Sequence, residues 1–361
     1  MNSIEITRTN GNIPKALPNN DHISGVAVTT EDDFQAILIS SADDEALVGV
    51  IDELKGSDAN LGDFCENFFA MNPGASLYVG VGANAVEKLQ KYAKGEIRQM
   101  AVFNNEGDIN EVIVELATTA KSLEEENMPL SLIVNVTPSV SIDGLLALDE
   151  VRASGRERIS VVIGCDEKGT GVFESLGTVL GAISAAAVKE SISWVRKFPT
   201  NIVAPSIANT SITQINSAVL DTLDQAGFIF YRTYTGLGGV YISDSHTMDL
   251  ATSDYNTIES VRTMDKAVRG IRTYLLPELG SPLTLDPETG CLAPATVKHL
   301  ETVASQQLTA MEKAGEISGW SVEIDPAQNV LATSTVEFVI KNVPIGVMRK
   351  ASVKIGYAQS V

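Results

Sequence analysis

The sequence predicts an α/β protein with a mainly parallel sheet and flanking helices, followed by a C-terminal α+β domain, with extended strand arms at both chain ends. Between residues 23 and 235, short apolar runs alternate with helical segments. Two of these runs, LSLIVNV and ISVVIG, are almost continuously apolar, which is typical of strands buried on both faces of a parallel sheet. Beyond residue 235, two long amphipathic helices precede strands whose apolar residues alternate, and this change of pattern predicts the second domain.

The chain has 361 residues, a formal net charge of −20 and 44% hydrophobic residues. This length and composition predict a globular protein of two domains with a sizeable core. The negative charge argues against binding to nucleic acid or to an anionic membrane surface, because both require a basic face. Between Glu31 and Glu66, eleven acidic residues accompany one lysine, Lys55. That distribution fits either solvated helix faces or an acidic surface that meets a partner.

The three cysteines, Cys65, Cys165 and Cys291, lie far apart and form no CxxC pair. We therefore expect neither a disulfide framework nor a zinc site, and a reducing compartment is the simpler interpretation. The first residues, MNSIEITRTNGNIPK, lack the apolar stretch of a secretory signal. The most apolar helical segment, 176–188, is too short to span a bilayer, and its glycine and alanine content predicts a close-packed buried helix.

Residues 1–22 have the pattern of an arm. Ile4 and Ile6 alternate with polar residues as in a strand, and NGNIPKALPNND then predicts an extended linker. A strand that pairs within its own domain is the alternative, and the pattern alone favours it.

The segment 23–235 is predicted to form the acidic α/β domain. Strands are expected at 36–39, 77–81, 99–103, 130–136, 159–163, 201–205 and 228–231. Helices are expected at 44–54, 83–94, 109–125, 142–153, 173–196 and 211–225.

The C-terminal domain, 236–361, begins with a glycine-rich turn, a short strand at 240–242 and a helix at 256–276. Asn256 and Glu259 are spaced for a capping box at the start of this helix, and Pro277 ends it. Its apolar positions share one face. Four cations, Arg262, Lys266, Arg269 and Arg272, form a separate stripe, and four aligned cations in an acidic chain suggest a partner.

A second helix is predicted at 294–314, with Pro294 in its first turn and Gly315 at its end. Alternating apolar residues then predict strands at 320–324, at 336–340 and in a terminal arm at 350–358. In that last strand the apolar residues are Val353, Ile355 and Tyr357. The surrounding tail is basic, because Lys341, Arg349, Lys350 and Lys354 accompany one acid after residue 335.

Two loops carry weak patterns of binding or catalysis. The glycines in the Gly80–Ala83 loop follow a strand and precede a helix, as in dinucleotide sites, but a tight turn in an α/β domain explains them better. Asp244, His246 and Asp249 crowd one loop and could bind a metal, although turn chemistry is the more common reason for such a cluster. An α/β nucleotide-binding or hydrolytic enzyme that uses these two loops is therefore the alternative function.

Three stretches of the C-terminal domain resemble the sheath proteins of contractile phage tails and related injection systems. These stretches are GGVYISD, SDYNTIESVRTMDKAVRGIR and PLTLDPETGCL. They are most similar to the compact sheath family of Bacteroidetes phages and injection systems. The similarity continues through GEISGWSVEIDPAQNVLATSTVEFVI and RKASVKIGYA, so that it covers roughly the last third of the chain.

The resemblance implies a structural protein without enzymatic activity or cofactor. Such subunits form a helical homo-oligomer of stacked rings around an inner tube protein, with baseplate and terminal cap proteins at its ends. They assemble in the bacterial cytoplasm and then belong to a phage tail or an injection particle, with no nucleic acid partner and no membrane insertion. The sequence does not distinguish a phage tail from a bacteriocin or an injection system.

By the same resemblance, Ile4 and Ile6 at one end and Val353, Ile355 and Tyr357 at the other would pair with the sheets of neighbouring subunits. The acidic α/β domain would face outward. The basic stripe, or the charges of the 294–314 helix, would contact the inner tube. The arginines could instead pair with acids inside the subunit or on a neighbouring sheath subunit.

Overall fold

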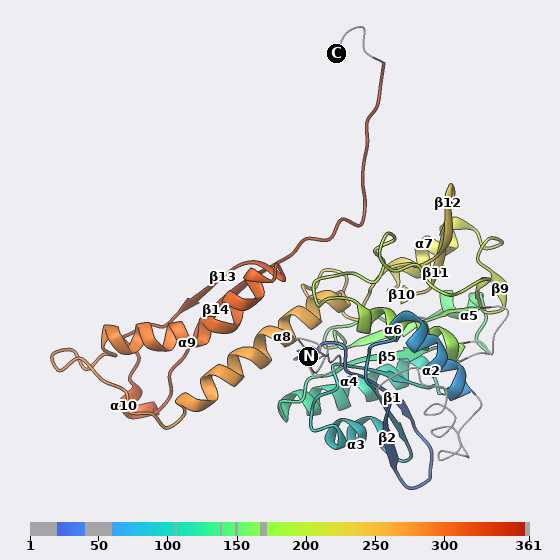
Figure 1. Cartoon of the computed structure of the whole chain (residues 1–361). Helices are drawn as coiled ribbons and strands as arrows, with labels where there is room; N and C mark the ends of the chain where they lie inside the picture. Colours follow the sequence, from blue (N-terminus) through green and yellow to red (C-terminus); the bar gives the residue numbers. More distant parts are fainter. Residues whose placement is uncertain are drawn as a thin grey trace, which may run out of the picture.

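The computed structural model describes residues 20–39, 60–104, 107–137, 139–148, 151–166 and 172–357. They form a layered α/β body and an elongated unit that projects from it (Figure 1). We call the described residues up to 257 the body and residues 258–344 the projecting unit. After the projecting unit, residues 345–349 return to the body and form what we call the strap. Residues 350–357, the tail, then leave as an extended chain.

A seven-stranded sheet forms the centre of the body, and its strands follow the order β10-β6-β5-β4-β1-β3-β2. Every neighbouring pair in it is parallel except β2 with β3, so the predicted mainly parallel sheet is confirmed. The strands are β1 (Ser24–Val28), β2 (Gln35–Ile39), β3 (Leu77–Val81), β4 (Gln99–Val102), β5 (Ser131–Asn135), β6 (Ile159–Val162) and β10 (Phe228–Ile229). The sequence pattern missed β1, although all five of its residues are buried between β3 and β4.

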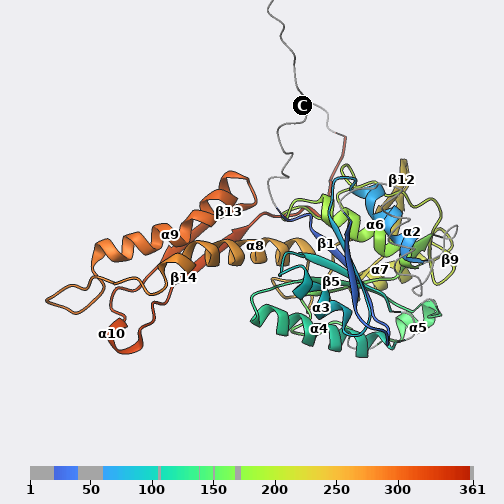
Figure 2. The same cartoon turned by 60° about the horizontal axis from the view of Figure 1, so that its bottom comes forward.

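Helices cover both faces of this sheet (Figure 2). On one face lie α2 (Asn60–Met71) and α6 (Val172–Ala185), which share a core with residues of β1, β3 and β4. On the other face lie α3 (Ala85–Tyr92), α4 (Ile109–Glu125) and α7 (Ser217–Gln225). The body is therefore a three-layer α/β/α sandwich, whose strands are buried on both faces as their apolar runs predict.

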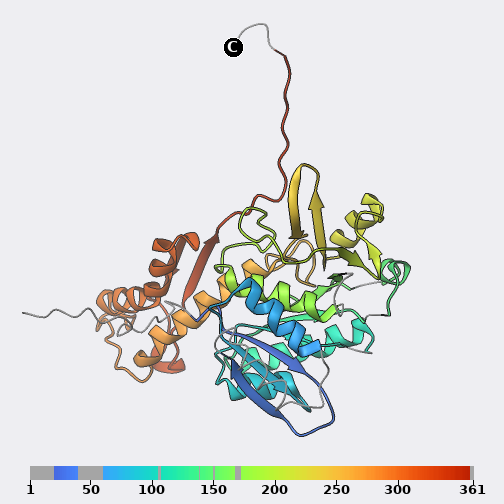
Figure 3. The same cartoon turned by 45° about the vertical axis from the view of Figure 1, so that its right-hand side comes forward.

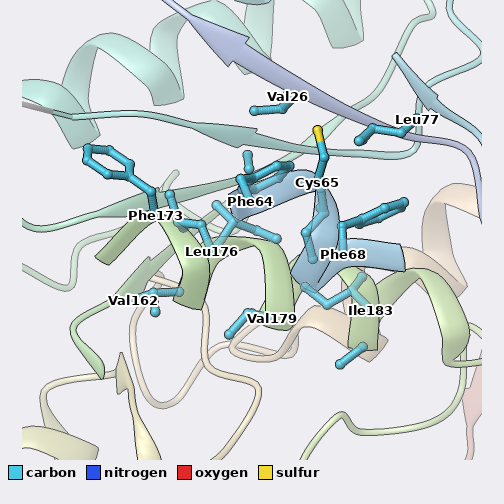
Figure 4. Packing of buried hydrophobic residues seen from close by; sticks show 14 of the residues in the cluster. Val26, Phe64, Cys65, Phe68, Leu77, Val162, Phe173, Leu176, Val179 and Ile183 are labelled. Carbon is cyan, nitrogen blue, oxygen red and sulfur yellow. The ribbon is translucent and has the colours of Figure 1, made fainter. Parts of the chain in front are cut away.

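Two glycines allow helices α2 and α6 to touch main chain to main chain. A Cβ atom added to Gly177 would lie 2.3 Å from the main-chain oxygen of Phe64, and one added to Gly181 would lie 2.6 Å from that of Phe68. Figure 4 shows Phe64 and Phe68 of α2 beside Leu176 and other apolar side chains of α6. The expected close-packed helix is confirmed, although it ends at Ala185 and not at residue 196.

Local patterns predicted some elements of the body correctly and misplaced others. Strand β3 and helix α4 have their predicted bounds, whereas the predicted helix at 44–54 lies outside the described residues. Helix α5 (Ile142–Leu146) is much shorter than predicted, and α7 begins at Ser217, where Asn216 accepts a hydrogen bond from the main-chain N–H of Ala218. The predicted strand at 201–205 is wrong, because β8 begins only at Pro205.

Two small sheets complete the body. One joins β7 (Gly164–Asp166), β8 (Pro205–Ile207) and β9 (Thr210–Ser211). The other is the hairpin of β11 (Tyr231–Tyr234) and β12 (Leu237–Ile242), which stands out from the body in Figure 3. The predicted domain boundary at residue 235 falls in the turn of this hairpin.

The projecting unit consists of two long helices and a two-stranded antiparallel sheet. Its elements are α8 (Ile258–Leu275), η1 (Leu276–Glu278), α9 (Pro294–Lys313), β13 (Ile317–Glu323), α10 (Val330–Thr333) and β14 (Val339–Pro344). Ala267 of α8 packs with Leu308, Met311 and Ile317 in a small core between these layers. The predicted capping box is wrong, because Thr257 precedes the helix and Asn256 donates its side-chain N–H to the oxygen of Ala251. Among the described residues, no helix is long and apolar enough to cross a bilayer.

Candidate assembly surface

The tail is an exposed apolar segment. Val353, Ile355 and Tyr357 are 81%, 95% and 112% exposed relative to the reference state, and the tail extends away from both the body and the projecting unit (Figure 1). Within the described part of the chain, residues 350–357 pair with no strand. Because side chains alternate along an extended chain, the three apolar residues can share one face of a strand. The predicted terminal strand therefore has no partner in its own described chain.

An unpaired sheet edge lies in the projecting unit. Strand β14 pairs with β13 on one side, and no other described strand joins it on the second side. Such an edge offers a row of main-chain donors and acceptors to another strand. A two-stranded ribbon is also marginally stable without further packing, so an added strand would complete this small sheet.

A shallow apolar groove of about 370 Å³ lies between α8 and β14. Its lining is formed by Met264, Ala267, Val268, Ile271, Arg272, Leu308, Ile340 and Asn342. Val268, at 51% exposure, is an apolar residue of α8 left open to solvent there. The groove and the open edge of β14 therefore present apolar side chains next to free main-chain groups.

The basic stripe of α8 does not face outward as a unit. Arg262 is 4% exposed and donates to the main-chain oxygens of Ala186 and Asp21, each at 3.1 Å. Lys266 bonds to the carboxylates of Asp21 at 2.7 Å and Glu316 at 2.6 Å. Burial, only partly offset by the charge of Asp21, lowers the pKa of the Arg262 guanidinium to about 10.

The other two cations of the stripe differ from each other. Arg269 lies 3.8 Å from a carboxylate oxygen of Asp21, whereas Arg272 is exposed at the groove and has no ion pair with the described residues. Pairing with acids inside the subunit, the alternative left open by the sequence, thus describes Arg269 and also Lys266, whereas Arg262 bonds to main-chain oxygens. Of the four cations of the predicted interface, Arg272 is exposed and the other three are buried or half-buried.

Helix α8 is further fixed to the body at the amino-terminal edge of the sheet. Arg158, immediately before β6, donates to both carboxylate oxygens of Asp265 at 2.8 and 2.9 Å, and to Glu124. Asp21 precedes β1 at the same edge. Bidentate arginine–carboxylate pairs are geometrically specific, so these bonds set the direction in which α8 leaves the body.

The strap returns the chain to the body through Arg349. Its Nε donates to the two carboxylate oxygens of Asp244 at 2.9 and 3.1 Å. Its Nη2 donates to Ser245 Oγ at 3.1 Å and to a carboxylate oxygen of Glu259. The sequence pattern does not predict this contact, because nothing local distinguishes Arg349 from the other cations of the basic tail. Glu259, expected to cap α8, instead accepts from Arg349 and from Ser245 Oγ.

Two family models together match almost the entire chain. The model of the DUF2586 N-terminal domain matches residues 1–246, and that of the DUF2586 C-terminal domain matches residues 254–361. The chain belongs to the DUF2586 family. No curated protein matches the sequence. The C-terminal DUF2586 domain contains α8, the rest of the projecting unit, the strap and the tail, and so the apolar groove and the open edge of β14.

Packing explains the glycines of the Gly80–Ala83 loop in this DUF2586 protein. Gly82 has a φ of 130°, and an added Cβ atom would lie 2.6 Å from Cα of Phe34. An added Cβ atom at Gly80 would lie 3.1 Å from the Phe34 ring. The segment before β2 therefore occupies the space against this loop, and the glycines are needed for that close approach.

The Asp244–Asp249 loop has structural partners for its polar groups. Asp244 bonds to Arg349, His246 Nε2 lies 3.7 Å from a carboxylate oxygen of Asp244, and Arg152 Nε donates to the main-chain oxygen of Asp249. Within the described ranges, no three His, Cys, Asp or Glu residues are grouped as metal ligands would be. The N-terminal arm residues Ile4 and Ile6 lie outside the described residues.

Proposed function

We propose that this DUF2586 protein is the structural sheath subunit of a contractile tail or injection system, and that it polymerises around an inner tube by strand exchange between subunits. The observation that carries the proposal is the tail, whose alternating apolar side chains are almost fully exposed. A soluble protein rarely leaves such a segment uncovered in its working state. The resemblance of the C-terminal domain to sheath proteins supports the same function.

Strand β14 of a second subunit is the acceptor that the proposal assigns to the tail. Addition of a strand to a free sheet edge uses main-chain hydrogen bonds for affinity and alternate side chains for specificity. Val353, Ile355 and Tyr357 would cover the apolar groove between α8 and β14, and Val268 would lie under them. Backbone hydrogen bonds and apolar burial would then form together.

The donor and the acceptor are different surfaces of one chain, and this determines the type of assembly. A contact between unlike surfaces repeats head to tail, so it closes into a ring or continues as a helix. A sheath contains both arrangements, because its subunits form rings and the rings stack helically around the tube. The N-terminal arm, with Ile4 and Ile6, would supply a second connection of the same kind.

The proposed mechanism is mechanical and needs no cofactor. Subunits assemble in an extended, metastable lattice, and a signal from the baseplate releases a transition to a contracted lattice with greater contact area. Rigid bodies that move about flexible connections are a common form of such transitions. The ion pairs of Arg158 and Lys266 support this function, because they would keep α8 rigidly attached to the body while the arms bend.

Electron microscopy of the purified protein tests the proposal directly. Long hollow cylinders are expected for the intact chain, and a version that lacks residues 350–361 should fold without forming them. Val268→Asp should also prevent cylinders, because it places a carboxylate under the added strand, whereas Thr273→Asp on an exposed part of α8 should not. Discrete particles under all conditions, or cylinders that persist without residues 350–361, would overturn the proposal.

A further inference from the structure

The strap crosses an open cleft instead of packing into a core. The cleft has a volume of about 700 Å³ and is lined on the body side by residues that include Trp194, Tyr234 and Ser243. Ile345 and Met348 of the strap line its other side, and Met348 is 83% exposed. Apolar packing between the strap and the body is therefore sparse.

Arg349 provides the polar attachment at the end of this strap. Its guanidinium contacts Asp244, Ser245 and Glu259, and the side chains of Asp244 and Glu259 are 12% and 6% exposed. The next residue, Lys350, is exposed and has no ion pair with the described residues. The Arg349 side chain itself is 34% exposed. The chain thus changes within one residue from a partly buried ion cluster to an exposed extended segment.

We propose that Arg349 is a latch that holds the strap over the cleft and fixes the place and direction in which the C-terminal tail leaves the body. Its receptor is the carboxylate pair of Asp244 and Glu259, joined through Ser245. The value of this latch for assembly rests on the proposed sheath function, because a neighbour can capture the tail efficiently only if its direction is defined. The latch itself is a property of the single chain.

The electrostatics of the receptor favour the closed latch. Ser245 Oγ lies 2.6 Å from Glu259 Oε2 and 3.5 Å from Asp244 Oδ1. If Arg349 left, two nearly buried carboxylates would face each other across one hydroxyl, and like charges in such a site are strongly unfavourable. His246 Nε2 lies 3.7 Å from a carboxylate oxygen of Asp244 and 3.7 Å from one of Asp224, and it does not replace the guanidinium at Glu259.

The strap has the freedom to swing once the latch is open. Pro344 is the last residue of β14, and an added Cβ atom at Gly346 would meet no other atom within 4 Å. The hydrogen bonds of Arg349 attach the chain after Gly346 to the body. Without them, this segment would lose that polar attachment.

Distance measurement on the single chain tests this inference. Nitroxide labels at Lys121→Cys in helix α4 and Val353→Cys in the tail, in a Cys291→Ser background, are compared by double electron–electron resonance. The labelled chains are measured as monomers isolated by gel filtration, so that no neighbouring subunit holds the tail. We expect one narrow distance distribution for this protein and a broad one for Arg349→Met.

The Arg349→Met variant leaves two unpaired carboxylates and could unfold the receptor, so a second variant separates folding from positioning. Arg349→Met combined with Asp244→Asn and Glu259→Gln removes all three charges, and it should keep a cooperative unfolding transition while the distribution stays broad. Lys350→Met removes the neighbouring cation and should leave the distribution narrow.

Three results would overturn the inference. They are a broad distribution before any latch residue is changed, a narrow one in the triple variant, and equal broadening by Lys350→Met. Because these distances are measured on subunits that are not in cylinders, the latch can fail while cylinders still form, and cylinders can be absent while the latch is confirmed.

Discussion

The Nη2 atom of Arg262 donates to the main-chain oxygen of Asp21 at 3.1 Å, which joins helix α8 to the residues that lead into the interior strand β1. The same aspartate accepts from Lys266 through its side chain. The junction between the body and the projecting unit is therefore held by buried polar contacts from two distant parts of the sequence. Since Arg262 and Arg272 lie on the same helix in opposite environments, they form a matched pair for experiment.

Arg262→Met should destabilise the protein, whereas Arg272→Met should have little effect. Loss of the Arg262 guanidinium leaves the main-chain oxygen of Ala186 without its donor, although that of Asp21 still accepts from Gln99 Nε2, and an unsatisfied buried acceptor costs about 1–3 kcal/mol. We expect the free energy of unfolding to fall by about 2–4 kcal/mol in urea titrations. Equal stability of the two variants would show that the buried contacts of Arg262 contribute nothing net.

Ile355→Asp should abolish cylinders without changing the stability of the monomer. Ile355 is 95% exposed, so its replacement disturbs no packing within the described chain, but a carboxylate buried at a subunit contact is strongly unfavourable. Ser352→Asp adds the same charge on the opposite face of the strand and serves as the control. Electron microscopy and thermal unfolding are the two measurements, and normal cylinders from Ile355→Asp would place the tail outside any subunit contact.

Gly177→Ala should be among the most damaging single-methyl changes in the body. The new Cβ atom would lie 2.3 Å from the Phe64 oxygen, so helices α2 and α6 must separate, and overpacking of this kind costs about 1–3 kcal/mol or more. Gly144→Ala in α5 meets nothing closer than 3.4 Å and should be neutral or slightly stabilising. Calorimetric unfolding temperatures compare the two, and a neutral Gly177→Ala would contradict the close helix contact.

Stability should decline in alkaline solution because of Cys65. Burial, with a smaller contribution from the charge of Glu66, raises the pKa of its thiol from 9.0 to about 12. Above about pH 9 the unfolded chain releases this proton and the folded chain retains it, so the free energy of unfolding falls by up to about 1.4 kcal/mol per pH unit. The stabilisation is complete below the unfolded pKa and is lost as the pH rises through the folded one.

The control for this pH dependence is Cys65→Ala, compared with the unchanged protein between about pH 8 and pH 10. Although the variant loses packing at every pH, its stability should decline less steeply. Identical slopes for the two proteins would show that the thiol ionises alike in both states.

The sequence by itself determined the elements whose signal is local. Helix α4 has a regular apolar face and Asp108 as its cap, and β3 is an apolar run between turn residues, so both were predicted with their bounds. The heptad-like spacing in α8 likewise identified a helix and its cationic stripe. The alternation of Val353, Ile355 and Tyr357 identified the tail as a potential strand, and its exposure agrees with a segment that has no partner in its own described chain.

Tertiary structure alone decided where these elements meet. Strand β1 is short and contains Ser24 and Gly25, so only its pairing with β3 and β4 reveals it as an interior strand of the sheet. Arg262 and Lys266 of α8 bond to Asp21, and Glu259 bonds to Arg349. Both partners are distant in sequence from the helix. Local periodicity fixes which side chains share a face, but the charge that each face meets is set by long-range packing, because burial of an ion requires a partner that no local pattern specifies.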